Sequence, residues 1–68
     1  MLADQDVVAT AARHVAEGKR IVAAQKERIA RLKAKGLSTL DAEQTLQVFE
    51  TSLAIFQRHR DELLGLHK

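Results

Sequence analysis

Apolar side chains recur with a seven-residue period in two stretches of this chain, separated by a short polar break. Such a period places them on one face of an α-helix, at the positions named a and d of a heptad. The a and d residues of the first stretch are Val8, Ala11, Val15, Gly18, Val22, Gln25, Ile29 and Leu32. Those of the second stretch are Thr39, Ala42, Leu46, Phe49, Leu53, Phe56, Arg60 and Leu63. The pattern predicts two amphipathic helices and an all-α fold.

The break between the two stretches carries signals that end one helix and start another. Gly36 suits the left-handed conformation that closes a helix. Ser38 or Thr39 can cap the next helix, and Ser38 with Asp41 is a variant of the capping box. We therefore expect a single domain over 1–68, with helix 1 over about 4–35, a turn over 36–38 and helix 2 over about 39–66.

Folding the chain back at Gly36 gives an antiparallel hairpin in which a positions of one helix face d positions of the other. The expected pairs are Val8–Leu63, Val15–Phe56, Val22–Phe49, Ile29–Ala42, Gly18–Leu53, Gln25–Leu46 and Leu32–Thr39. Small residues face large ones in several of these layers, as a well-filled core requires. Gly18 is tolerable inside a helix if another helix passes close to it.

Polar and charged residues beside this seam add two expectations. Gln25 occupies a d position, where it either fixes the register or the oligomeric state through a paired hydrogen bond or turns outward without a specific role. The e positions bring three lysines near two glutamates, so opposite charges should meet across the hairpin. These residues are Lys19, Lys26, Lys33, Glu43 and Glu50.

One hairpin cannot cover all the apolar surface that the pattern predicts, because the apolar arc of helix 2 is wider than one seam. A chain of 68 residues without cysteine also lacks the disulfides that stabilise small domains. We expect a homodimer that forms a four-helix bundle. The expected interface consists of Ile21, Val48, Ser52, Ile55, His59 and Leu66. The alternative is that Val48 and Ile55 are ordinary, scattered surface residues.

His14 and His59 form the one candidate ligand site. Both occupy g positions, which face each other in an antiparallel pair, and dimer symmetry can add a second pair. Four imidazoles can bind zinc or another transition metal, and a buried histidine pair can act as a pH switch. Alternatively, each histidine only hydrogen-bonds to water or to a neighbour such as Ser52.

Charge is distributed unevenly although the formal net charge is only +2. Residues 17–35 carry seven basic and two acidic side chains, whereas residues 39–68 carry three basic and five acidic ones. Basic, dimeric helical hairpins include RNA-binding proteins, so nucleic-acid binding is an alternative function. Against it, the basic residues spread around helix 1, and no exposed aromatic residue is expected to stack on bases.

Other classes of function find little support in the sequence. No segment approaches the roughly 20 apolar residues that span a membrane, and the N-terminus lacks the features of a signal peptide. The sequence has no cysteine nucleophile, glycine-rich phosphate loop or inward-facing carboxylate pair. We expect a cytoplasmic, non-enzymatic protein without a cofactor, which acts on a protein partner through its helical surfaces.

Several short motifs occur in order along the two predicted helices and the turn. They are His14-Val15-Ala16-Glu17-Gly18, Ile29-Ala30-x-Leu32, Gly36 with Thr39, Ala42-Glu43, Leu46-x-x-Phe49-Glu50 and His59-Arg60-Asp61-x-Leu63-Leu64. In these motifs, residues 14–64 resemble a family of short bacterial helical-hairpin proteins that has no known activity. The resemblance covers about three quarters of the chain and implies a stand-alone hairpin protein.

Overall fold

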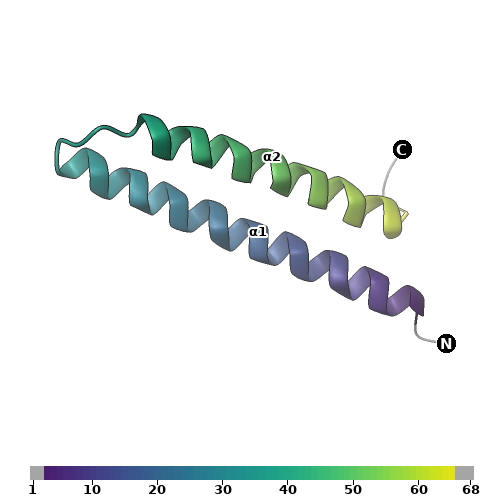
Figure 1. Cartoon of the computed structure of the whole chain (residues 1–68). Helices are drawn as coiled ribbons and strands as arrows, with labels where there is room; N and C mark the ends of the chain where they lie inside the picture. Colours follow the sequence, from purple (N-terminus) through teal and green to yellow (C-terminus); the bar gives the residue numbers. More distant parts are fainter. Residues whose placement is uncertain (1–2, 66–68) are drawn as a thin grey trace.

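The computed structural model describes the backbone of residues 3–65 and the side chains of residues 7–65. Helix α1 spans Ala3–Ala34 and helix α2 spans Leu40–Leu63. The two helices lie side by side and antiparallel, so the two ends of the chain lie at the same end of the molecule (Figure 1). The predicted all-α hairpin is confirmed. Neither described helix has a stretch long and apolar enough to cross a membrane.

Helix α1 ends at a glycine, as predicted. Gly36 has a φ angle of 72°. Its N–H donates to the Lys33 carbonyl at 3.0 Å, and the Leu37 N–H donates to the Leu32 carbonyl at 2.9 Å. This pair of bonds is the Schellman motif, which satisfies carbonyl groups that the helix end leaves free.

The start and the end of α2 differ from the prediction. Thr39 is the N-cap residue, but its side chain makes no capping hydrogen bond, and its hydroxyl donates to the Glu43 carboxylate at 3.1 Å. The capping box of Ser38 and Asp41 does not form, and Ser38 Oγ instead accepts a hydrogen bond from the Leu40 N–H at 3.4 Å. Helix α2 ends at Leu63 rather than near residue 66, because Gly65 takes a φ angle of 73° and its N–H bonds to the Glu62 carbonyl at 3.1 Å.

Contacts between the helices agree with the predicted register. A methyl group added at Gly18 would lie 3.0 Å from Leu53 Cδ1 and 3.8 Å from Leu53 Cα, so α2 passes close to this glycine. Gln25 Nε2 donates to the Ala42 carbonyl across the hairpin at 2.9 Å. Among the residues with described side chains, the buried apolar ones all occupy a or d positions of α1: Ala11, Val15, Val22 and Ile29.

The expected ion pairs across the hairpin are absent. Within residues 7–65 the ion pairs are Glu17–Arg20 and Arg60–Asp61, each formed within a single helix. The lysines at the e positions and Glu50 are exposed. An exposed ion pair gains little in water and must restrict two long side chains, so the prediction of bridges from sequence position alone was wrong.

Candidate functional site

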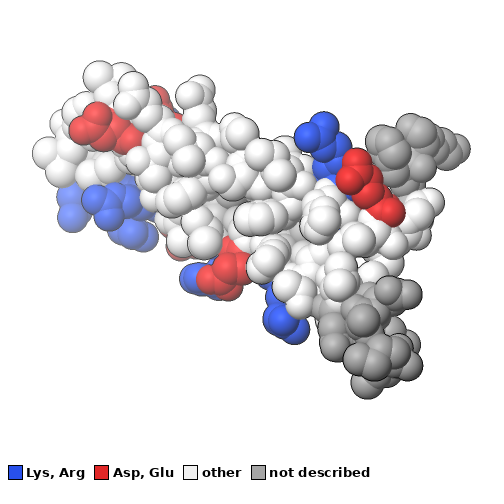
Figure 2. All heavy atoms as spheres, turned by 45° about the vertical axis from the view of Figure 1, so that its right-hand side comes forward, with Lys and Arg blue, Asp and Glu red and all other residues white. Residues whose placement is uncertain are grey.

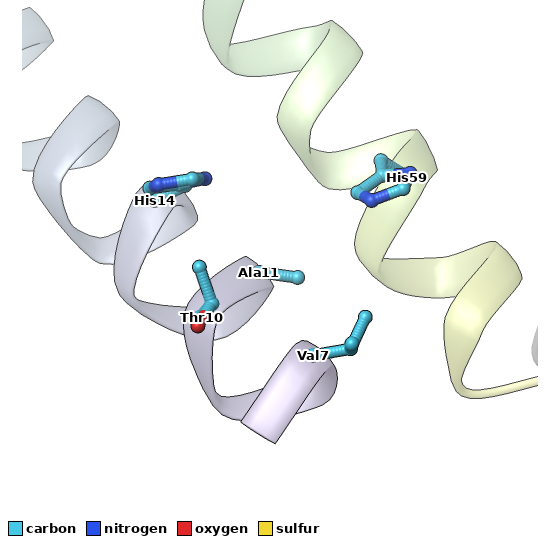
Figure 3. Close-up of a pocket in the computed structure, with 5 residues that line it drawn as sticks. All are labelled: Val7, Thr10, Ala11, His14 and His59. Carbon is cyan, nitrogen blue, oxygen red and sulfur yellow. The ribbon is translucent and has the colours of Figure 1, made fainter. Parts of the chain in front are cut away.

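A cavity of about 250 Å³ opens between the helices near the end of the hairpin that holds both chain termini. Its lining consists of Val7, Thr10, Ala11, His14 and His59. The two imidazole rings stand on opposite sides of the cavity, one from each helix (Figure 3). The structure thus brings together the two histidines that the heptad pattern places at one level.

His14 also supports the apolar seam. Its ring centroid lies 5.2 Å from that of Phe56, with 43° between the ring planes. Contacts between aromatic rings at this separation stabilise a fold modestly. His14 and His59 are both exposed, and no hydrogen bond joins either of them to Ser52, the neighbour that the sequence suggested. The described site is therefore an open apolar pocket flanked by two imidazoles.

A metal ion would need more ligands than one hairpin provides here. Zinc takes three or four protein ligands. Within the described part of the chain, no three His, Asp or Glu side chains gather in one place. A metal site at His14 and His59 would therefore need a second copy of the chain, and it stays a prediction.

The predicted dimer interface forms one flank of the hairpin, which we call the dimer flank and define as Ile21, Val48, Ser52, Ile55 and His59. Val48 is 62% exposed and Ile55 is 54% exposed. Ile21 and Ser52 are half-buried beside the seam. Leu66, the remaining predicted member, lies outside the described residues.

Sequence reasoning missed one part of this surface. Phe56 occupies a seam position, yet it remains 37% exposed. In the predicted register Phe56 faces the smaller Val15, which is buried, and a valine covers only part of a phenylalanine ring. The sequence could have indicated this exposure through the difference in size between the two facing residues.

Charged side chains are scarce in the middle of α2, although the two helices as a whole carry similar shares of them. Between residues 44 and 57 of α2, Glu50 is the sole charged residue. In Figure 2, white surface runs along the upper part of the molecule, where α2 lies, between charged groups toward its two ends. Depletion of charge is the compositional mark of a protein–protein interface core.

The charged side of α1 is solvated. Glu17 accepts hydrogen bonds from the Arg20 guanidinium one turn away. This bond, with the charge of Arg20, lowers the pKa of the Glu17 carboxyl, and the same bond, with the charge of Glu17, raises the pKa of Arg20. The basic residues of the last turns are exposed as well: Lys26, Arg28, Arg31, Lys33 and Lys35. They leave nucleic-acid binding as an alternative.

Comparisons with known protein families, with curated proteins and with solved structures find no match to this chain. The resemblance of residues 14–64 to short bacterial hairpin proteins stays a prediction. Arguments about function therefore rest on the surface of the hairpin itself.

Proposed function

We propose that this chain is a non-enzymatic interaction protein that binds a protein partner through helical surfaces and acts as a homodimer of hairpins in a four-helix bundle. The observation that carries the proposal is that α2 has no buried residue, whereas α1 has four within the described part of the chain. This helix nevertheless holds Leu46, Phe49, Leu53 and Phe56 at seam positions, and Val48 and Ile55 beside them. An apolar arc of this width extends beyond the surface that one facing helix can bury, so a second surface must pack against it to remove it from water.

The two helices differ in the size of their seam residues. In the predicted register, the leucine and phenylalanine seam residues of α2 face valine, glycine or glutamine of α1, whereas Ile29 and Leu32 of α1 face the smaller Ala42 and Thr39. The larger side chains of α2 cover Val15 and Val22, which are buried. The reverse does not hold, because small residues cannot cover leucine and phenylalanine. One hairpin thus completes the core on the α1 side and leaves it incomplete on the α2 side.

The accessible surface of the chain supports the same conclusion. It amounts to 5343 Å², whereas a compact monomer of 7.6 kDa exposes about 4,300 Å². The excess of roughly 1,000 Å² is close to the area of about 800 Å² that each partner buries in a standard interface. The radius of gyration is 15.5 Å, against about 11 Å for a compact domain of this length.

A dimer formed through this flank leaves the charged outer surface of α1 free. This surface includes Lys19, Lys26 and Lys33, none of which pairs with an acidic residue within the described part of the chain. We propose it as the surface for the other protein, because charged rims favour rapid and selective association.

Solution mass against protein concentration tests the proposal. We expect the wild type to be a dimer at micromolar concentration. Ile55→Asp should raise the dissociation constant about 100-fold or more, because it places a charge at the centre of an apolar contact. Sedimentation equilibrium measures both the oligomeric state of the wild type and the dissociation constant of the variant.

Gln47→Asp is the matched control, since Gln47 is an exposed residue of the same helix outside the dimer flank. It should leave the dimer intact. A folded wild type that stays monomeric at every concentration would overturn the proposed bundle.

A further inference from the structure

We propose that the second copy of this chain packs on the dimer flank about a two-fold axis perpendicular to the helices, at the level of Ser52 and within one helical turn of Ile21. Each helix then lies antiparallel to its own copy, and the two turns point in opposite directions. This inference rests on the proposed dimer and adds its geometry.

The distribution of charge on α2 indicates the position of the axis. Along the face that includes the dimer flank, charge occurs at Asp41 and Glu62. The residues between them on this face are uncharged: Thr45, Val48, Ser52, Ile55 and His59. The centre of this strip falls between residues 51 and 52.

Val48 and Ile55 lie at equal distances on either side of that centre. Antiparallel pairing about it therefore places Val48 of one copy against Ile55 of the other, and symmetry makes this contact twice. Ser52, which is small, meets its own copy near the axis and allows the two helices to approach closely. Asp41 and Glu62 stay at the solvated ends of the interface.

Helix α1 independently indicates the same level. Its g positions on this flank are His14, Ile21 and Arg28, with the apolar residue in the middle. In the register that the Gly18–Leu53 contact supports, Ile21 lies at the level of Glu50, within one helical turn of Ser52. Ile21 is half-buried beside the seam. The axis that pairs Val48 with Ile55 therefore passes within one helical turn of Ile21 and brings it close to its own copy.

The other closed arrangement has its two-fold axis parallel to the helices and stacks α1 on α2 of the second copy. It would place Ile55 at the level of Glu17. The Glu17 carboxylate is exposed and bonded to Arg20, and covering it with an apolar side chain would remove it from water. With the perpendicular axis, Glu17, one turn from Ile21, faces α1 of the second copy, so Val48 and Ile55 contact each other and not a carboxylate.

The geometry has a consequence for the histidines. His59 of one copy would lie opposite Gln44 of the other, and the two His59 residues would be about 20 Å apart along the helices. Each dimer would then carry two separate pockets with two imidazoles each, and four imidazoles would not meet. The pockets lie at opposite ends of the bundle.

Disulfide cross-linking tests the axis, because the natural chain has no cysteine. We expect Ser52→Cys and Ile21→Cys each to form a disulfide with its own copy under mild oxidation. Thr45→Cys is the matched control, since it lies on the same flank, but its two copies would be about 20 Å apart. Both test variants should give roughly tenfold more cross-linked dimer than this control.

Two other outcomes would contradict the proposed two-fold axis. One is a disulfide that forms only in a mixture of Ile21→Cys and Ser52→Cys chains, since this identifies the parallel axis. The other is a dimer, established by sedimentation, in which neither variant cross-links with itself. A monomeric wild type would instead contradict the proposed function, so the two failures are distinguishable.

Discussion

At the scale of single residues, Gln25 is the polar group that links the two helices. Its side chain occupies an apolar seam position, and its Nε2 donates to the Ala42 carbonyl at 2.9 Å. The Ala42 carbonyl can only accept a hydrogen bond, so the side chain at position 25 must supply the donor for this contact. Of the two interpretations that the sequence allowed, the structure supports the one in which Gln25 bonds across the hairpin.

Gln25→Glu should destabilise the hairpin at pH 7 by about 1 kcal/mol, because a carboxylate cannot donate to the Ala42 carbonyl. A protonated carboxyl can donate, so folding should raise the pKa of the new side chain above its unfolded value. The lost free energy of unfolding should therefore be regained below about pH 4. It should be lost again as pH rises through the pKa that the new glutamate has in the folded protein. Urea unfolding at the two pH values measures the difference.

Gln47→Glu provides the control for that pH dependence, because Gln47 is exposed on α2 and makes no cross-hairpin bond in the described structure. The two variants carry the same charge. Equal pH profiles for both would show that the Gln25 bond contributes nothing to stability.

At the scale of the elements, both helices end at a glycine with a positive φ angle, Gly36 after α1 and Gly65 after α2. The first of these allows the chain to reverse and brings the two seams together. No atom lies within 4 Å of the position that a Cβ would occupy at Gly36. A substitution there would therefore test the backbone conformation alone.

Gly36→Ala should lower the free energy of unfolding by about 1 kcal/mol, because a side chain with a Cβ disfavours the left-handed region. Gly36→Asn should cost less, because asparagine tolerates that region better. Thermal unfolding followed by circular dichroism would rank the melting temperatures of the wild type and the two variants. Equal melting temperatures would indicate that the turn adopts another conformation in solution.

At the scale of the whole molecule, the hairpin is long and thin, with extents of 54 × 22 × 14 Å. A layer two helices wide and one helix thick has two broad faces, and α2 leaves apolar side chains on one of them. A second hairpin on that face would double the thickness and enclose Phe56. The proposed axis keeps the histidine pockets of such a bundle apart.

Zinc binding would therefore separate the two interpretations of His14 and His59. With the perpendicular axis, stoichiometric zinc should leave the melting temperature of the wild type within about 1 °C of its value with a chelator. A four-imidazole site should raise it by about 10 °C or more at a concentration far above the dissociation constant. A rise of that size, lost in His14→Ala, would establish a metal-binding bundle in place of the proposed axis.

The sequence by itself determined the two helices, the break at Gly36 and the register of the seam, including the approach of Gly18 to Leu53. These follow from periodicity and from one chain reversal, which are properties of the linear order of residues. Only the tertiary structure decided the ion pairs within each helix, the Gln25 bond and the contact between His14 and Phe56. Such contacts depend on side-chain rotamers and on the relative sizes of facing residues, which a heptad position does not specify.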